Sequence, residues 1–152
     1  MCKAKANGNY INSMLALREA LDSGCEEALL LDNEGYVAEG SGENFFLVQK
    51  GKSVTPELTS CLEGITRDTV FALAAELNIE VVEKRITRDE VYIADEAFFT
   101  GTAAEVLPIR ELDGRTIGSG KRGPVTEKLQ SMYFDQVFCK RKENPKWSTT
   151  IN

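Results

Sequence analysis

The chain has 152 residues, a length typical of one domain, and 42% of its residues are hydrophobic and 28% charged. These proportions exclude a disordered chain, a fibre and a coiled coil, and no apolar run approaches the roughly 18 residues that a membrane span needs. The net charge of −6, from 18 basic and 24 acidic residues, provides no overall basic footprint for nucleic acid.

Histidine is absent from the chain. Its absence excludes Ser-His-Asp and Cys-His triads, His-ligated zinc and imidazole acid–base catalysis. The cysteines Cys2, Cys25, Cys61 and Cys139 are scattered without a C-x-x-C pair, which indicates free thiols in a reducing compartment rather than disulfides or a metal site. Because the first residues form no apolar signal segment, we expect a cytoplasmic protein. Without histidine or paired cysteines, we expect that it uses no metal.

The first half of the chain alternates a helix with short strands. Apolar spacing predicts a helix over 10–23 that ends at Gly24. A hairpin is expected from strands 28–32 and 36–39, with a turn between them. A further strand at 44–48 follows the Gly40-Ser41-Gly42 interruption, and 54–56 is predicted to be an edge strand closed by proline.

In the second half, Thr66 is the predicted N-cap of a helix that runs to Leu77, with Asn78 as its C-cap. A strand is expected at 79–85, followed by a capping box over 87–90 and a short helix. Strands 95–100 and 105–112 precede a last helix that starts at Pro124. Its expected buried face comprises Val125, Leu129, Met132, Tyr133, Val137 and Phe138. Because this order lacks clean βαβ units, it predicts an α+β fold with a mixed, curled sheet flanked by helices.

Two segments offer side chains for chemistry. Lys5 lies in Lys5-Ala6-Asn7-Gly8-Asn9-Tyr10, and a lysine near a terminus is usually solvated. The functional alternative is a Schiff-base lysine that attacks a carbonyl carbon. Glu39 lies where a strand meets the Gly-Ser-Gly turn, either as a solvated acid of a bulged hairpin or as a carboxylate that keeps a ring nitrogen protonated.

Two further segments offer backbone amides. Gly64-Ile65-Thr66 begins a helix, and its free N–H groups form an anion site unless the helix binds only its own cap. Small residues at 100–104 form either a second nest of amides or an ordinary tight turn. Together, a lysine, a carboxylate and two amide nests meet the requirements of pyridoxal phosphate.

Five segments carry a family resemblance: AKANGNY, LLLDNEGYVAEGSGENFF, LEGITRDTV, IADEAFFTGTAAEVLPIRELDG and GPVTEKLQ. From about Lys5 to Asp135 the chain resembles the large C-terminal domain of branched-chain amino acid aminotransferase, a fold-type IV pyridoxal-phosphate enzyme. The resemblance implies a pseudo-barrel-like domain over 1–139 and a charged C-terminal tail over 140–152. It also implies that a smaller N-terminal domain and a leading strand are absent from this chain.

The resemblance implies roles for individual residues. Lys5 matches the catalytic Schiff-base lysine, and we expect burial to favour its neutral form. The matches that hold the cofactor are Tyr10 at the phenolic oxygen, Glu39 at the ring nitrogen, Leu62 on the ring face, and Ile65, Thr66 and Thr102 at the phosphate. The amides of Thr102 and Ala103 match the nest for the substrate α-carboxylate.

The implied activity is amino transfer between leucine, isoleucine or valine and 2-oxoglutarate, in a homodimer or a higher assembly. One alternative is a non-catalytic fragment that needs a partner chain and exposes apolar surface near 40–44 and 100–104. Another keeps the fold but performs D-amino acid transamination or aminodeoxychorismate-lyase chemistry.

Overall fold

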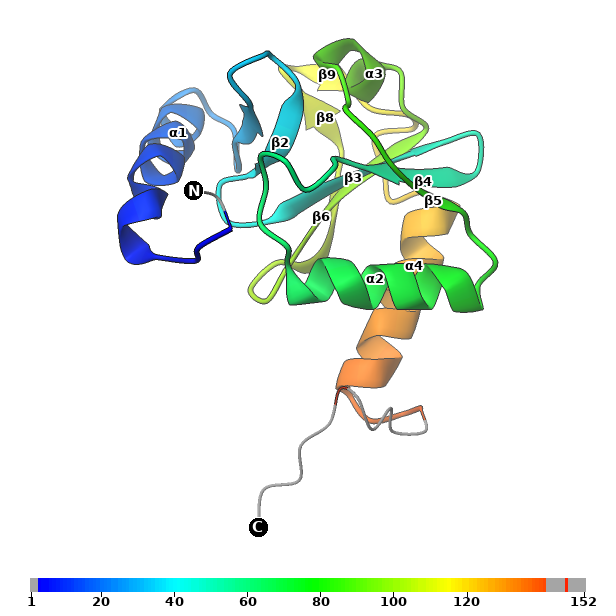
Figure 1. Cartoon of the computed structure of the whole chain (residues 1–152). Coiled ribbons are helices and arrows are strands. Elements are labelled where there is room, and N and C mark those ends of the chain that lie inside the picture. Colours follow the sequence, from blue (N-terminus) through cyan, green and yellow to red (C-terminus); the bar gives the residue numbers. More distant parts are fainter. Residues whose placement is uncertain (1–2, 142–146, 148–152) are drawn as a thin grey trace.

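A computed structural model describes residues 3–141 and 147 of the chain. Its helices are the 3-10 helix η1 (Asn7–Asn9), α1 (Tyr10–Asp22), α2 (Ile65–Glu76), α3 (Arg88–Tyr92) and α4 (Pro124–Val137). Its strands are β1 (Leu29–Leu31), β2 (Val37–Gly40), β3 (Asn44–Gln49), β4 (Lys52–Thr55), β5 (Val81–Glu83), β6 (Glu96–Gly101), β7 (Glu105–Ile109), β8 (Glu111–Leu112) and β9 (Arg115–Thr116). Figure 1 shows α2 and α4 together on one side of the sheet, and the β1–β2 hairpin, α3 and β8–β9 on the other.

The central sheet has five strands in the order β5-β4-β3-β6-β7 and is mixed, because β4 and β5 are parallel and the other neighbours antiparallel. The α+β class is confirmed, but the curled, barrel-like sheet is wrong. The β1–β2 hairpin forms a sheet of its own, and the edge strands β5 and β7 are not paired with each other. The predicted edge strand is also corrected: β4 lies between β3 and β5 and ends at Thr55, before Pro56 interrupts the pairing.

Strand β3 is buried on both faces. Phe45 and Leu47 pack in one core with Val37 of β2, whereas Phe46 and Val48 pack in a second core. That second core includes Val70 and Leu73 of α2 and Leu129 of α4. Burial on both faces explains why this strand is an unbroken apolar run rather than an alternating one.

Several predicted boundaries change. Helix α2 begins at Ile65 with Gly64 as N-cap, so Thr66 lies inside the first turn and is not the cap. Asn78, expected as the C-cap, lies one residue beyond it with φ of 56°. The strand expected at 105–112 divides into β7 and β8. The capping box between Thr87 and Glu90 is confirmed.

Large apolar side chains remain exposed along α1, at the end of α4 and at Ile65 in the first turn of α2. Helix α1 has no buried residue, and its exposed side chains include Ile11, Met14, Leu15 and Leu21. In α4, Val137 and the following Phe138 are exposed, contrary to the predicted buried face. The reason is visible in Figure 1, where the C-terminal turns of α4 extend past the sheet. Within residues 3–141 and 147, no helix has the length and apolar character needed to cross a membrane.

Candidate active site

A cleft of about 620 Å³ opens between the N-terminal segment, the β2–β3 turn, the start of α2 and the β6–β7 turn. Its volume lies in the range of small-molecule sites. It gathers all but one of the residues singled out from the sequence: Lys5, Tyr10, Glu39, Leu62, Ile65, Thr66 and Thr102. Ala103 follows Thr102 in the β6–β7 turn and is exposed, but it is not among the lining residues.

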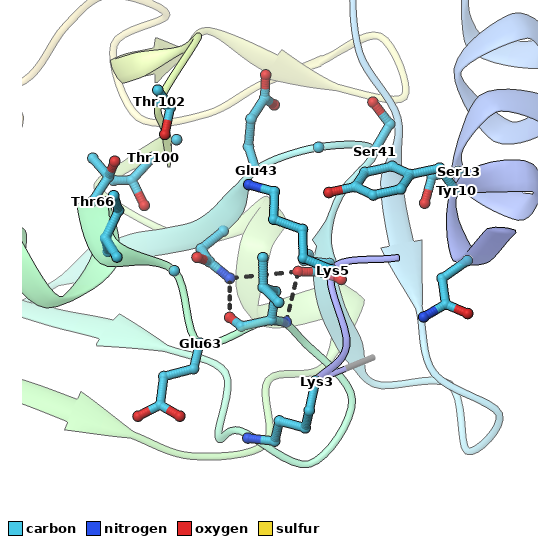
Figure 2. A pocket seen from close by; sticks show the side chains of 18 of the residues that line it. Lys3, Lys5, Tyr10, Ser13, Ser41, Glu43, Glu63, Thr66, Thr100 and Thr102 are labelled. Atoms are coloured by element: carbon cyan, nitrogen blue, oxygen red, sulfur yellow. Dashed lines mark hydrogen bonds between the residues drawn. The ribbon is translucent and has the colours of Figure 1, made fainter. Parts of the chain in front are cut away.

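Glu39 is fixed at the base of the cleft by Asn44 and Leu62. Its Oε2 accepts a hydrogen bond from the Leu62 amide at 2.9 Å and from Asn44 Nδ2 at 3.5 Å. The same Asn44 nitrogen donates to the Leu62 carbonyl at 2.7 Å. These bonds, drawn as dashed lines in Figure 2, join β2, β3 and the loop before α2 into one unit. The orientation of the carboxylate is therefore set before any ligand binds.

Burial raises the pKa of the Glu39 carboxyl above its usual value, and the bond from the Leu62 amide partly offsets this. A carboxylate that has lost hydration is stabilised by a charged donor placed against it. The protonated nitrogen of a pyridine ring is a donor of that kind.

The first turn of α2 forms the adjoining wall. Its first intrahelical bond runs from the Asp68 amide to the Gly64 carbonyl at 3.0 Å, so the amides of Ile65 and Thr66 precede the helical ladder. A Cβ at Gly64 would stand 2.1 Å from Asn44 Oδ1, which leaves room only for glycine. Open amides at the positive end of a helix bind phosphate and other anions.

Thr100 is a site residue that the sequence did not single out by itself. Its side chain is buried, lines the cleft, and its hydroxyl has no hydrogen-bond partner among the described residues. Buried hydroxyls without a partner are rare because each loses its hydration. The Thr100 hydroxyl therefore has an unused donor and acceptor that a polar ligand in the cleft can satisfy. In Figure 2, Thr100 lies with Thr66 and Thr102 on one side of the cleft.

In the same view Tyr10 lies on the opposite side, and the Lys5 side chain extends towards the middle of the cleft. Lys5 is exposed, so the expected burial of this amine is wrong for the chain as it stands. The neighbouring Ala4 carbonyl accepts two local hydrogen bonds, from the Ala6 amide at 2.7 Å and from Asn9 Nδ2 at 2.8 Å. Tyr10 is positioned differently, as the first residue of α1.

Exposed apolar surface does not lie where it was expected. Residues 40–44 and 100–104 contribute no large exposed apolar side chain. Such side chains occur instead along α1, at the end of α4 and at Ile65, which is 77% exposed at the start of α2.

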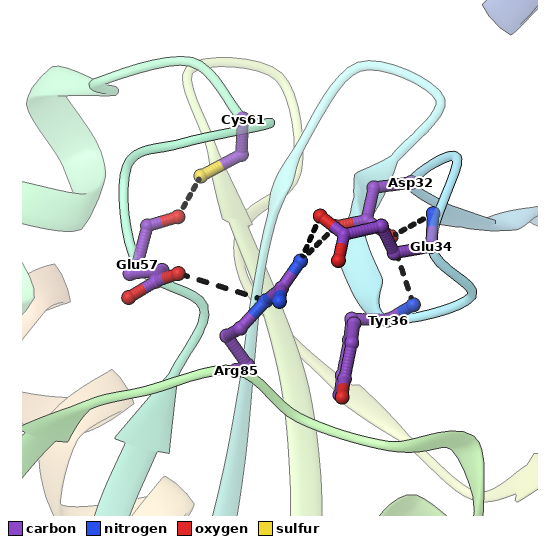
Figure 3. A network of polar contacts seen from close by, with 6 residues as sticks. All are labelled: Asp32, Glu34, Tyr36, Glu57, Cys61 and Arg85. Atoms are coloured by element: carbon purple, nitrogen blue, oxygen red, sulfur yellow. Dashed lines mark hydrogen bonds and ion pairs between the residues drawn. The ribbon is translucent and has the colours of Figure 1, made fainter.

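An ion-pair network supports the loop that leads into the cleft. The Arg85 guanidinium pairs with Glu34 at 2.5 Å, Asp32 at 3.6 Å and Glu57 at 3.8 Å, and lies 4.1 Å from the centre of the Tyr36 ring. Figure 3 shows these groups converging from the β1–β2 turn and from the loop before Leu62. The amide of Tyr36, with further help from Arg85, lowers the pKa of Asp32. The network therefore connects the hairpin that carries Glu39 to the loop that binds it.

Sequence reasoning also missed Glu43 and Asn44, which line the cleft beside Glu39. Both belong to the Gly42-Glu43-Asn44 segment after the glycine-rich turn. A polar Asn at the start of an otherwise apolar strand was the available signal, because a buried amide needs partners.

The donor set fits pyridoxal phosphate. One cleft presents a fixed carboxylate for a ring nitrogen, open amides and threonine hydroxyls for a phosphate, and a lysine amine for an aldehyde. The orphaned Thr100 hydroxyl and the volume of the cleft agree with a polar ligand of this size.

Known proteins resemble this chain over nearly its whole length. The model of the family "Amino-transferase class IV" matches residues 2–112. The branched-chain-amino-acid aminotransferase of Pseudomonas aeruginosa is 66% identical over 151 residues, which are 99% of this chain and 49% of that protein. The corresponding enzyme of Escherichia coli K12 is 45% identical over 150 residues, or 98% and 48% of the two chains.

Solved structures agree with this relationship. The T.th. branched-chain amino acid aminotransferase with pyridoxamine 5′-phosphate superposes with a TM-score of 0.96 at 52% identity, covering 99% of this chain and 50% of that one. The Escherichia coli enzyme gives a TM-score of 0.91 at 45% identity, with 97% and 50% covered. This chain thus spans about half the length of the relatives it matches. Fold, site and sequence together place the chain in the class IV aminotransferase family.

Proposed function

We propose that this chain supplies the cofactor-binding part of a branched-chain amino acid aminotransferase. The reaction would exchange an amino group between leucine, isoleucine or valine and 2-oxoglutarate, with pyridoxal phosphate as cofactor. One observation carries the proposal: the fixed Glu39 carboxylate, the open start of α2 and the Lys5 amine border the same cleft. The branched-chain enzymes among the relatives support these substrates over lyase chemistry.

When bound, the cofactor supplies an aldehyde for the amino group and a ring that accepts electrons. Glu39 would keep the ring nitrogen protonated, and Leu62 would pack against the ring. Tyr10 would donate to the phenolic oxygen. The amides of Ile65 and Thr66, with the Thr66 and Thr102 side chains, would hold the phosphate.

Lys5 is the catalytic residue of the proposal. Its amine would hold the cofactor through the aldehyde, and as a free amine it would take up and return the proton at the substrate α-carbon. The amides of Thr102 and Ala103 hold the substrate carboxylate in the β6–β7 turn. Because Lys5 is exposed here, we expect parts of the enzyme outside this chain to cover it.

Covalent labelling tests the cofactor site. Pyridoxal phosphate is added to the chain, borohydride fixes the adduct, and peptide mass spectrometry locates it. We expect the label on Lys5, with Lys3→Ala as the matched control, since Lys3 lines the same cleft. A label that stays after Lys5→Ala and disappears after Lys3→Ala would refute the assignment.

Reconstitution tests the enzymatic part of the proposal. The relatives are twice as long as this chain, so we expect transaminase activity when the chain is combined with the remaining half of such an enzyme. We further propose a cytoplasmic homodimer or higher assembly. Persistent inactivity of a mixture that binds the cofactor normally would favour a non-catalytic fragment, an alternative that the exposed apolar face of α1 also supports.

A further inference from the structure

Glu43, in the turn between β2 and β3, has an unusual environment. It lines the cleft, yet its Oε2 is buried and has no hydrogen-bond partner in the described part of the chain. Glu27 lies beside it, close enough for its charge and a side-chain hydrogen bond to act on the Glu43 carboxyl. If both acids were ionised, a buried oxygen would lack a donor and two negative charges would be in contact.

A single proton removes both problems, and the surroundings indicate which acid holds it. Glu27 Oε1 already accepts bonds from the Ala28 amide at 2.7 Å and the Ser41 amide at 3.2 Å. That Glu27 oxygen is therefore already paired with two backbone donors and needs no proton as a partner. Glu43 has no such donor, so the proton resides on Glu43 and is donated to Glu27.

The packing around Glu43 holds this geometry in place. A Cβ at Gly101 would stand 3.3 Å from Glu43 Cγ, and one at Gly40 would stand 3.1 Å from Glu43 Oε2. The side chain therefore lies against two glycines, Gly40 of β2 and Gly101 of β6. A larger residue at either position would press on the Glu43 side chain.

The other ionisable groups of the cleft lie on neighbouring elements. Glu39 lies on β2, and Glu63 lies in the loop before α2. Lys3, Lys5 and Tyr10 border the cleft from the N-terminal side. Strand β6 and the turn after it present uncharged residues, Thr100, Gly101 and Thr102. Burial raises the pKa of Glu43 to about 7, with the charge of Glu27 and the hydrogen bond with it acting in the same direction.

We propose that Glu43 is a positioning residue whose proton, shared with Glu27, locks the β2–β3 turn that carries Glu39 and Asn44. This positioning role rests on the proposed function, because it matters only if Glu39 and Asn44 shape a cofactor site. The lock also keeps one negative charge out of a cleft that binds a phosphate and a carboxylate. Ionisation of Glu43 would add that charge and repel Glu27 from the Ser41 amide.

The first test measures the proton directly and needs no cofactor. Carbon-13 NMR of labelled glutamate carboxyls, assigned through the backbone, should give Glu43 a titration midpoint near neutral pH. Glu27→Gln should move that midpoint towards the ordinary value of about 4.3. Glu63→Gln is the control, because Glu63 lines the same cleft but is exposed, and it should leave the midpoint in place. A Glu43 midpoint near 4.3 in the native chain would overturn the proposal.

The second test measures positioning. Pyridoxamine 5′-phosphate affinity is compared at pH 6 and 8.5 for the native chain, Glu43→Gln and Glu63→Gln. An amide at position 43 still donates to Glu27 but cannot ionise, so Glu43→Gln should retain roughly three- to tenfold more of its affinity on raising the pH. The Glu63→Gln profile should follow the native one. Superimposable native and Glu43→Gln profiles would refute the positioning role.

The two tests separate the proposals. If no variant binds the phosphate compound while Glu43 still titrates near neutrality, the proposed function fails and the proton-sharing pair stands. If the compound binds but Glu43 titrates as an ordinary acid, the pair fails and the proposed function stands.

Discussion

The two sides of the cleft differ in how completely this chain builds them. On the side of β2, β3 and α2, Glu39, Asn44 and Leu62 are joined by hydrogen bonds, and Thr66 and Thr100 are buried. On the side of the N-terminal segment and α1, Lys5 is exposed and no residue of α1 is buried. The groups proposed for ring nitrogen and phosphate are therefore preorganised, whereas the lysine is open to solvent.

The difference follows from what each side packs against. The side formed by β2, β3 and α2 is built on a sheet whose two faces pack against two hydrophobic cores. Helix α1 has neither core beneath it, and Ile11, Met14 and Leu15 are each at least 64% exposed. Because preorganisation accounts for much of binding and catalysis, the strand side should determine cofactor affinity and the lysine side covalent capture.

The largest effect is expected from Gly64→Ala. The new methyl group would collide with Asn44 Oδ1 and displace the amide that connects Glu39 to Leu62. We expect a loss of about 2 kcal/mol or more in the free energy of unfolding, measured in urea, together with weaker phosphate-ligand binding. Gly8→Ala is the control from the lysine side, because nothing lies within 4 Å of its Cβ position. Equal losses in the two variants would remove the contrast between the sides.

Glu39→Gln should separate stability from binding. The amide oxygen still accepts from the Leu62 amide, so we expect the free energy of unfolding to change by less than about 1 kcal/mol. The charge that faces the ring nitrogen is lost, and cofactor affinity should fall roughly tenfold to a hundredfold. Calorimetric titration with pyridoxamine 5′-phosphate measures the affinity. An unchanged affinity would mean that Glu39 does not face the ring.

The pH dependence of stability should differ in sign between the cleft and the Arg85 network. Glu39 and Glu43 have raised pKa values in the folded chain, so their contribution is full below about pH 4.5 and is lost as the pH rises, for Glu43 through about 7. Asp32 has a lowered pKa, so its contribution is present above its unfolded value of 3.8 and is lost as the pH falls through its folded value.

Stability should therefore be greatest between about pH 4 and 5 and should fall by about 1–2 kcal/mol towards neutrality, after allowance for solvent screening. Urea unfolding across this range checks the prediction. The Glu43→Gln chain should show a shallower decline. Stability that rises steadily from pH 5 to 7 would show that the cleft acids do not have raised pKa values.

The smallest effect is expected on α1. Met14→Gln and Leu15→Gln replace side chains that are each 67% exposed, so the free energy of unfolding should change by no more than about 0.5 kcal/mol. Val70→Ala is the comparison, because Val70 is fully buried on the core-facing side of α2 and its truncation should cost more. A loss on α1 as large as the loss at Val70 would mean that α1 is packed in solution.

Much of the fold follows from local sequence signals. Glycines, capping residues and apolar spacing located the helices within a few residues, and the hairpin at 28–39 is confirmed. The strand order could not be derived, because β4 reaches the sheet interior through its parallel pairing with β5, a contact between distant segments. The exposed end of α4 was missed for a related reason, since its periodicity does not reveal where the sheet beneath it ends.

In the site, the residues that motifs singled out lie together, and their roles remain proposals. Lys5, Glu39 and Thr66 do border one cleft. The sequence did not single out Thr100 or Glu43. Thr100 stands out because its buried hydroxyl has no partner among the described residues, and Glu43 stands out because its carboxyl is partly buried beside Glu27. Ala103 remains a proposal that rests on the family motif.

The most direct measurement compares pyridoxamine 5′-phosphate binding by Lys5→Ala and by Gly64→Ala. This ligand has an amine in place of the aldehyde, so its affinity reports the preorganised side without covalent capture. If the β2, β3 and α2 side is preorganised, Lys5→Ala should bind within about threefold of the native chain, and Gly64→Ala should bind at least roughly tenfold more weakly. The reverse order, with binding lost in Lys5→Ala and kept in Gly64→Ala, would contradict the central claim.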